Sequence, residues 1–214
     1  MRARPFEIAT RDGLTLRGES RPVSADWVLM VHDIGQDLDC WDPLVAPLNG
    51  AGFSVATIDL RGHGASDGEP DESMVPSDLA DILSQARRDV AGTLVLVSAG
   101  GVAMAALTSD LPARPDAVVL FSPTPLRDSS SDLRGAGMAK LFFVGALDEQ
   151  LDASARYLRN RSVGQAGVIS FPTDRQGAEL LLEPWRSHAV EQVLGFVKVV
   201  ASPTATTEPT GGRE

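Results

Sequence analysis

Few side chains in this sequence could act as a base or a nucleophile near neutral pH. Histidine is the usual general base because its pKa lies near neutrality, and the 214 residues contain three histidines, His32, His63 and His188. The one cysteine, Cys40, cannot form an internal disulfide, and no neighbouring histidine or lysine would lower the pKa of its thiol. We interpret Cys40 as a packing residue, so base chemistry depends on where the fold places the histidines.

Short apolar runs alternate with helical patterns along most of the chain. Alternating apolar residues on both sides of Asp12-Gly13 predict a β-hairpin at the start. Strands of a covered sheet are predicted at Trp27–Val31, Phe53–Ile58, Thr93–Val97, Ala117–Phe121, Leu141–Val144 and Val168–Phe171. Strands that alternate with helices after a hairpin predict an α/β fold, a mostly parallel sheet with helices on both faces.

Two of the predicted helices have a clear apolar face. One carries Leu79, Ile82, Leu83, Ala86 and Val90 on one side, and Ser77 is its expected N-cap. The last helix is predicted to begin near Pro184, with Val190, Val193, Leu194 and Val197 facing inward. The short segment between Phe121 and Leu141 leaves no room for a sizeable cap domain.

Composition limits the organisation and the partners of the chain. No repeat or change of composition divides residues 1–200, which we expect to form one domain, and residues 201–214, rich in Pro, Thr and Gly, are expected to form a disordered tail. A formal charge of −10 argues against nucleic-acid and anionic-membrane partners. No apolar run reaches the ~18 residues of a membrane span. With no signal peptide and a single cysteine, the expected location is the cytoplasm.

Three stretches resemble the α/β-hydrolase superfamily, in particular its small esterase and serine aminopeptidase-like members. They are V-L-M-V-H-D-I-G at Val28–Gly35, I-D-L-R-G-H-G-A-S-D-G at Ile58–Gly68, and L-F-F-V-G-A-L-D at Leu141–Asp148. The second matches the family's D-x-R-G-H-G-x-S loop at each fixed position. The resemblance implies an α/β-hydrolase fold, and it implies that His63 and His32 are mainly structural.

The family's nucleophile lies on a sharp strand-to-helix turn, G-x-S-x-G, and two registers place it here. In the favoured register, Gly100 occupies the nucleophile position and Val102 replaces a glycine, so the turn has no nucleophile. In the other register Ser98 is the nucleophile, but Leu96 then takes a position that normally holds a small residue. Both registers stay open at this point.

The other catalytic positions are compared in the same way. The family's last loop, P-x-x-x-H-G-x-x-L-L, aligns with Pro172–Leu181 and puts Gln176 at the histidine position. An amide has no pKa near neutrality and cannot shuttle a proton. Asp148 matches the acid position, although it could equally cap the next helix. The oxyanion donors would be the N–H groups of Ile34 and Gly101.

Asp33 and His188 complete the comparison. Asp33 replaces the second residue of the family's H-G-x-G, where its carboxylate would oppose a developing oxyanion unless it points away. His188 lies twelve residues beyond Gln176, inside the last predicted helix, where it is expected to be exposed; it is the remaining candidate for a substitute base.

Three functions therefore compete. The leading hypothesis is a catalytically impaired serine-hydrolase homologue, a pseudoenzyme that binds a small ligand or a protein partner. The alternative is an active esterase, thioesterase or peptidase-like hydrolase that uses Ser98. A third, purely structural role predicts a filled pocket. We expect no cofactor and no metal in any of the three.

Overall fold

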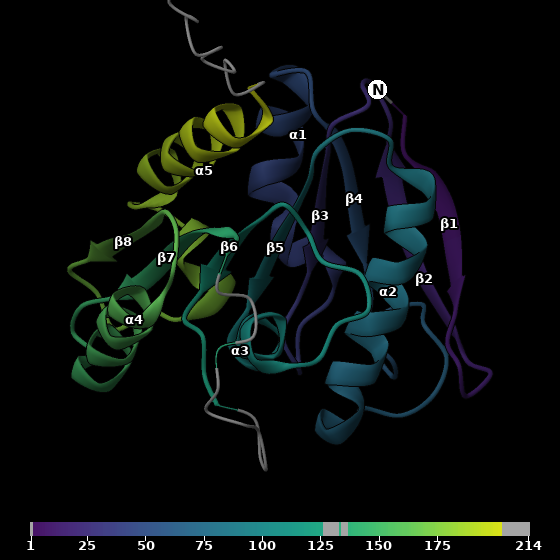
Figure 1. The fold of residues 1–214 in the computed structure, drawn as a ribbon, viewed down its shortest axis with the longest axis horizontal. Helices are drawn as coiled ribbons and strands as arrows, with labels where there is room; N and C mark the ends of the chain where they lie inside the picture. Colours follow the sequence, from purple (N-terminus) through teal and green to yellow (C-terminus); the bar gives the residue numbers. More distant parts are fainter. Residues whose placement is uncertain (1, 126–132, 134–136, 203–214) are drawn as a thin grey trace, which may run out of the picture.

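The structure is a computed structural model that describes residues 2–125, 133 and 137–202. Its centre is one eight-stranded sheet with the order β1-β2-β4-β3-β5-β6-β7-β8 (Figure 1). The strands are β1 (Arg4–Ala9), β2 (Thr15–Arg21), β3 (Trp27–Val31), β4 (Ser54–Ile58), β5 (Leu94–Ala99), β6 (Ala117–Phe121), β7 (Ala139–Gly145) and β8 (Ala166–Phe171). The pairs β1–β2 and β2–β4 are antiparallel, whereas the other pairs are parallel.

Five α-helices cover the two faces of the sheet. They are α1 (Asp42–Gly50), α2 (Val75–Asp89), α3 (Gly100–Thr108), α4 (Glu149–Arg161) and α5 (Arg186–Ala201). Apolar residues of α2, α3 and α4 form one core with the sheet, and those of α1 and α5 form a second core on the opposite face. Burying each large apolar side chain contributes about 1.5–3 kcal/mol. The predicted α/β fold, with its N-terminal hairpin and helices on both faces, is confirmed.

Most differences from the predicted elements are small. Strands β4, β5, β7 and β8 begin or end one or two residues away from the expected positions, because apolar runs do not mark where ladder hydrogen bonds stop. The expectation that Ser77 caps its helix is wrong. Helix α2 already begins at Val75, with Pro76 in its first turn, and its N-cap residue Met74 makes no side-chain cap bond.

The segment between β6 and β7 and the end of helix α5 concern two further predictions. Residues 122–138, between β6 and β7, are too few for a cap domain. Helix α5 extends to Ala201, the first residue of the predicted tail, and residues 203–214 of that tail lie outside the described residues. In the described ranges, no helix is long and apolar enough to cross a membrane.

Candidate functional site

A cavity of about 420 Å³ lies at the carboxyl edge of the sheet. In open α/β sheets, the loops that leave the carboxyl ends of parallel strands meet at one edge, and ligands usually bind there. The segments after β3, β5, β6 and β8 line this cavity with Asp33, Ile34, Gln36, Gly100, Ser122, Thr124, Asp174, Gln176, Gly177 and Glu179. The fold therefore gathers several of the predicted site residues around one hollow.

The turn between β5 and α3 contains Gly100. The strand ends at Ala99 and the helix starts at the next residue, so the chain reverses without a loop. Gly100 has a φ of +52°, a left-handed conformation that glycine adopts freely and that costs most other residues about 1 kcal/mol or more. Gly101 and Val102, which follow in the first helical turn, are buried. A sharp strand-to-helix turn thus has a residue without a side chain at its apex.

The carboxylate of Asp33 fills the space beside that apex. Its Oδ1 accepts a hydrogen bond from the Gly101 N–H at 3.0 Å. A Cβ atom added to Gly100 would overlap with Oδ2 and Cγ of Asp33. Burial raises the pKa of Asp33, because removal from water disfavours the charged form more than the nearby N–H groups of Ile34, Gly101 and Val102 favour it. A fixed carboxylate therefore occupies the space into which a side chain at position 100 would project.

Asp148 and Gln176 contact each other across the loops that follow β7 and β8. The Gln176 side-chain amide donates to Oδ2 of Asp148 at 2.8 Å. The second oxygen of Asp148, Oδ1, accepts from the Leu151 N–H at 3.0 Å and so caps α4. The sequence left Asp148 open between a site residue and a helix cap. Its Oδ1 makes the helix cap, and its Oδ2 accepts the hydrogen bond from Gln176.

His32 and His63 each use both ring nitrogens within the loops. The Nε2 atom of His32 accepts from the Leu60 N–H at 3.0 Å, and that of His63 accepts from the Gly35 N–H at 2.9 Å. Their Nδ1 atoms lie 2.7 Å from the carbonyl oxygens of Asp33 and Arg61, so Nδ1 carries the proton in both rings. Burial lowers the pKa of His32. Both rings therefore serve to fasten the two loops together.

Ser98 and His188 lie apart from the cavity lining. Ser98 is fully buried inside β5, paired with Val31 and Leu120, and strand alternation puts it on the same face as Leu96. Its Oγ has no hydrogen-bond partner among the described residues. His188 is exposed on α5, and its ring meets the ring of Phe171 edge-on at 5.8 Å. None of the hydrogen bonds between described residues joins Ser98 to His188.

The structure adds Ser122, which the sequence analysis missed. It follows β6 at the edge of the sheet, is 1% exposed, and has a φ of +47°, the one left-handed non-glycine residue in the described part of the chain. Its Oγ accepts from the Gly177 N–H at 2.9 Å and so ties β6 to the loop after β8. Strained backbone of this kind often occurs at functional sites. Its position directly after a predicted buried strand was the available signal.

Charge and donor chemistry at the cavity favour some ligands over others. Asp33, Asp174 and Glu179 are its ionisable lining residues, and no lysine or arginine lines it within the described ranges. No group of three or more His, Cys, Asp or Glu among the described residues could hold a metal ion. The lining therefore suits neutral or positively charged groups better than anions.

Cys40 is half-buried and lies before α1, where its side chain packs against the core that includes α1 and α5. Burial, together with the neighbouring carboxylates, raises the pKa of its thiol to about 12. A thiol of raised pKa is a weak nucleophile at neutral pH. This environment agrees with the interpretation of Cys40 as a packing residue.

Comparison with known proteins places this geometry in context. A family model described as Alpha/beta hydrolase family matches residues 28–208. A curated relative, the "dihydrolipoyllysine-residue acetyltransferase component of acetoin cleaving system" of Cupriavidus necator, is 32% identical over 133 residues, which make up 59% of this chain and 34% of the relative. The chain thus spans about a third of the length of that relative.

Solved structures of esterases share the architecture. The esterase Pf2001 of Pyrococcus furiosus superimposes with a TM-score of 0.75 at 15% identity, covering 92% of both chains. The esterase EaEST of Exiguobacterium antarcticum gives a TM-score of 0.71 at 15% identity, covering 90% of this chain and 99% of the esterase. At such identities the likeness concerns the fold, and the chemistry has to be argued from the site.

Proposed function

Because the chain belongs to the Alpha/beta hydrolase family, we propose that it is a serine-hydrolase homologue that forms no acyl-enzyme and uses the cavity at the carboxyl edge to bind a small ligand. One observation carries this proposal. The Asp33 carboxylate stands beside Gly100, where a nucleophile would project, and accepts the Gly101 N–H. The Asp33 side chain thus occupies the space that the nucleophile would need. It also occupies the Gly101 N–H, a donor that an oxyanion would need.

The chemistry of acyl transfer explains why this matters. A nucleophile must attack the carbonyl, a base must take its proton, and N–H donors must stabilise the negative oxygen. In the proposed register Gly100 has no attacking atom, and the Gln176 amide cannot accept and return a proton. An oxyanion near Gly101 would also meet the negative charge of Asp33, which raises its energy. The three substitutions act against the same reaction from three separate loops.

Labelling with a fluorophosphonate probe tests the loss of acyl transfer. We expect no labelling of the wild-type chain and weak labelling at position 100 in the variant D33G/G100S/V102G/Q176H. The Asp33→Gly change is essential, since a side chain at position 100 would otherwise overlap with the carboxylate. The matched control is the triple variant D33G/V102G/Q176H, which restores the surroundings without a nucleophile and should stay unlabelled.

The alternative function makes the opposite prediction for the wild-type chain. An active hydrolase using Ser98 would be labelled at Ser98, and Ser98→Ala would abolish the labelling. That result would refute the proposed register and the proposed loss of acyl transfer together. Labelling that persists in Ser98→Ala would point to another nucleophile and would contradict both hypotheses.

Ligand binding at the cavity needs a separate measurement. Titration with methylammonium and with acetate, followed by amide NMR signals, compares a cation with an anion of similar size. The carboxylates of the lining should favour methylammonium, with the largest changes at Gly100, Gly101 and Gly177. Equal or stronger effects of acetate at these amides would contradict this part of the proposal.

A further inference from the structure

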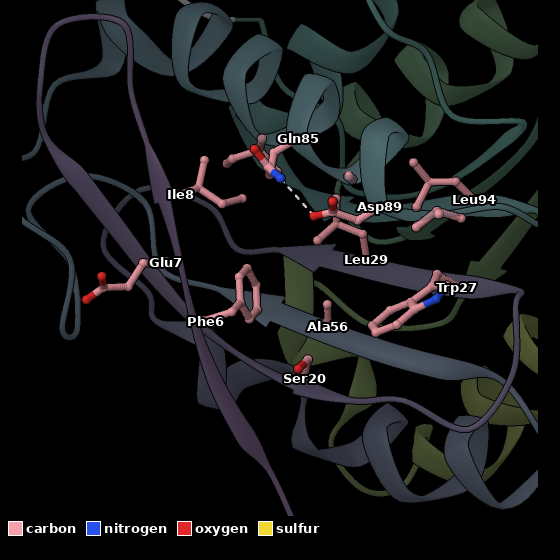
Figure 2. Close-up of a pocket in the computed structure, with 13 residues that line it drawn as sticks. Phe6, Glu7, Ile8, Ser20, Trp27, Leu29, Ala56, Gln85, Asp89 and Leu94 are labelled. Carbon is pink, nitrogen blue, oxygen red and sulfur yellow. Dashed lines mark hydrogen bonds between the residues drawn. The ribbon is translucent and has the colours of Figure 1, made fainter.

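A second cavity, of about 210 Å³, lies between the N-terminal hairpin, the sheet and helix α2 (Figure 2). Trp27 and Leu94 line it, and they are the first residues of β3 and β5. The cavity thus reaches the amino ends of these strands, whereas the candidate site lies at their carboxyl edge. It plays no part in the function proposed above.

Small residues create this hollow. Phe6 pairs with Gly18 across β1 and β2, and its ring lies so close that a Cβ at Gly18 would come within 2.7 Å of it. Ala56 of β4 lies beside Leu29 in the sheet, and Ala86 of α2 also lines the space. Larger residues at positions 56 and 86 would fill the gap between helix and sheet. The cavity is therefore set by side-chain size on three different elements.

The lining is mainly apolar and includes two aromatic side chains. Phe6 and Trp27 lie on either side of Ala56 in Figure 2, and both are half-buried although they pack against the core. An engineered apolar cavity of about 150 Å³ holds a benzene molecule. A space of about 210 Å³ with aromatic walls therefore has the size and the surface for one aromatic ring.

Two carboxylates line the cavity, those of Glu7 and Asp89. Glu7 forms an ion pair with Arg17 at 3.2 Å, and its side chain points away from the hollow in Figure 2. Asp89 is the last residue of α2, is exposed, and accepts a hydrogen bond from the Gln85 amide at 2.8 Å. A negative charge at a helix C-terminus is unfavourable to the helix dipole, so the helix itself gains nothing from this charge. No lysine or arginine lines the cavity in the described part of the chain. The polar end of the site therefore favours a positive group.

We propose that this cavity binds a small aromatic amine. The ring occupies the space between Phe6, Trp27 and Ala56, and the ammonium group donates a hydrogen bond to the carboxylate of Asp89. The occupant is thus one ring joined to a short cationic arm. Its chemistry follows from the size of the hollow, its apolar walls and the sign of the charge beside it.

Three matched probes test the proposal with the full chain: benzylamine, benzyl alcohol and benzoate. We expect benzylamine to bind about 1.4-fold to fivefold more tightly than benzyl alcohol, the range for one exposed charge interaction, and benzoate to bind most weakly. Binding of benzylamine should change the NMR signals of the Trp27 indole and of the Phe6 and Ala56 amides. The indole signal that is missing in Trp27→Phe is assigned to Trp27. No binding of any probe, or tightest binding of benzoate, would overturn the proposal.

Variants of the cavity residues test where the probe binds, and they separate the apolar space for the ring from the carboxylate that would bind the ammonium group. Ala56→Leu and Ala86→Leu place a side chain where the ring would lie, so each should weaken binding at least about tenfold while the folded spectrum is kept. Ala153→Leu, at an exposed position of α4, is the matched control and should bind as the wild type does. Asp89→Asn should remove the preference for benzylamine over benzyl alcohol. Full affinity in both filled variants would overturn the proposal, as would a preserved preference in Asp89→Asn.

Discussion

Among single residues, Asp33 has the largest influence on the candidate site. The loop that carries Asp33 is fixed by His32 and His63. The His32 ring bonds to the Asp33 carbonyl and the Leu60 N–H, and the His63 ring accepts from the Gly35 N–H. The carboxylate is therefore held against Gly101 by the surrounding loops. Because burial raises its pKa, the charge of Asp33 acts against folding in spite of the backbone donors around it. A residue that costs stability is typical of functional sites, which agrees with the ligand binding proposed for this edge.

The pH dependence of stability should reveal this cost. A carboxyl whose pKa is raised by folding contributes stability that is fully present below its unfolded value, 3.8, and lost as pH rises through the folded-state pKa. We expect the free energy of unfolding of the wild type, relative to Asp33→Asn, to fall as pH rises through this window. Urea unfolding of both proteins between about pH 3 and 7 measures it. A difference that is constant or that rises with pH would contradict the direction of the shift.

At the scale of elements, Asp148 links the start of helix α4 to the loop after β8. The carboxylate caps the helix through the Leu151 N–H and holds Gln176 through its other oxygen. The residue that the resemblance predicts for the acid position is therefore also the N-cap of a helix. An aspartate here has a structural reason to be present whether or not a catalytic histidine exists.

Substitutions of Asp148 separate the cap from the charge. Asp148→Ala removes the cap and should lower the free energy of unfolding by about 1 kcal/mol. Asp148→Asn keeps an oxygen for the Leu151 N–H and should cost less than half as much. Gln176→Ala, which leaves the cap in place, serves as the control and should cost under about 0.5 kcal/mol. Chemical denaturation measures all three, and equal losses for Asp148→Ala and Asp148→Asn would argue against the cap.

At the scale of the whole molecule, Arg61 joins three distant parts of the chain. Its guanidinium donates two hydrogen bonds of 2.6 Å to the buried carboxylate of Asp78 on α2. A third donor reaches Asp12 in the hairpin turn at 3.0 Å. The hairpin, the loop after β4 and helix α2 thus meet at one cation, which also fixes the loop that carries His63. The Arg-Gly-His-Gly motif serves the assembly of the domain in this way.

Removal of Arg61 should strongly destabilise the protein. Arg61→Ala leaves the carboxylate of Asp78 buried without its cation, a loss of about 3–5 kcal/mol for a buried pair. The double variant Arg61→Ala/Asp78→Asn removes the stranded charge and should recover part of the loss. Thermal or urea unfolding compares the two. A loss below about 1 kcal/mol in Arg61→Ala would show that the ion pair is not a main support of the fold.

The sequence by itself determined the fold class and most of the elements. The spacing of apolar residues is a property of each short segment of sequence. The strands and the amphipathic helices could therefore be located within one or two residues. The matching loop at Ile58–Gly68 identified the family resemblance for the same reason, since its residues are contiguous. The sequence also singled out Gly100, Gln176, Asp33 and Asp148 as positions where the family's chemistry would be carried or lost.

Only the tertiary structure decided how these residues meet. The Asp33 carboxylate bonds to Gly101 beside Gly100, Gln176 bonds to Asp148, and Ser122 bonds to Gly177 at the same cavity. These contacts join residues 28 to 68 positions apart in sequence. The same holds for the aromatic-lined cavity, whose walls come from β1, β2, β3, β4, β5 and α2. Sequence patterns record which face of an element is apolar. The filling of space between elements depends on packing, which no single segment encodes.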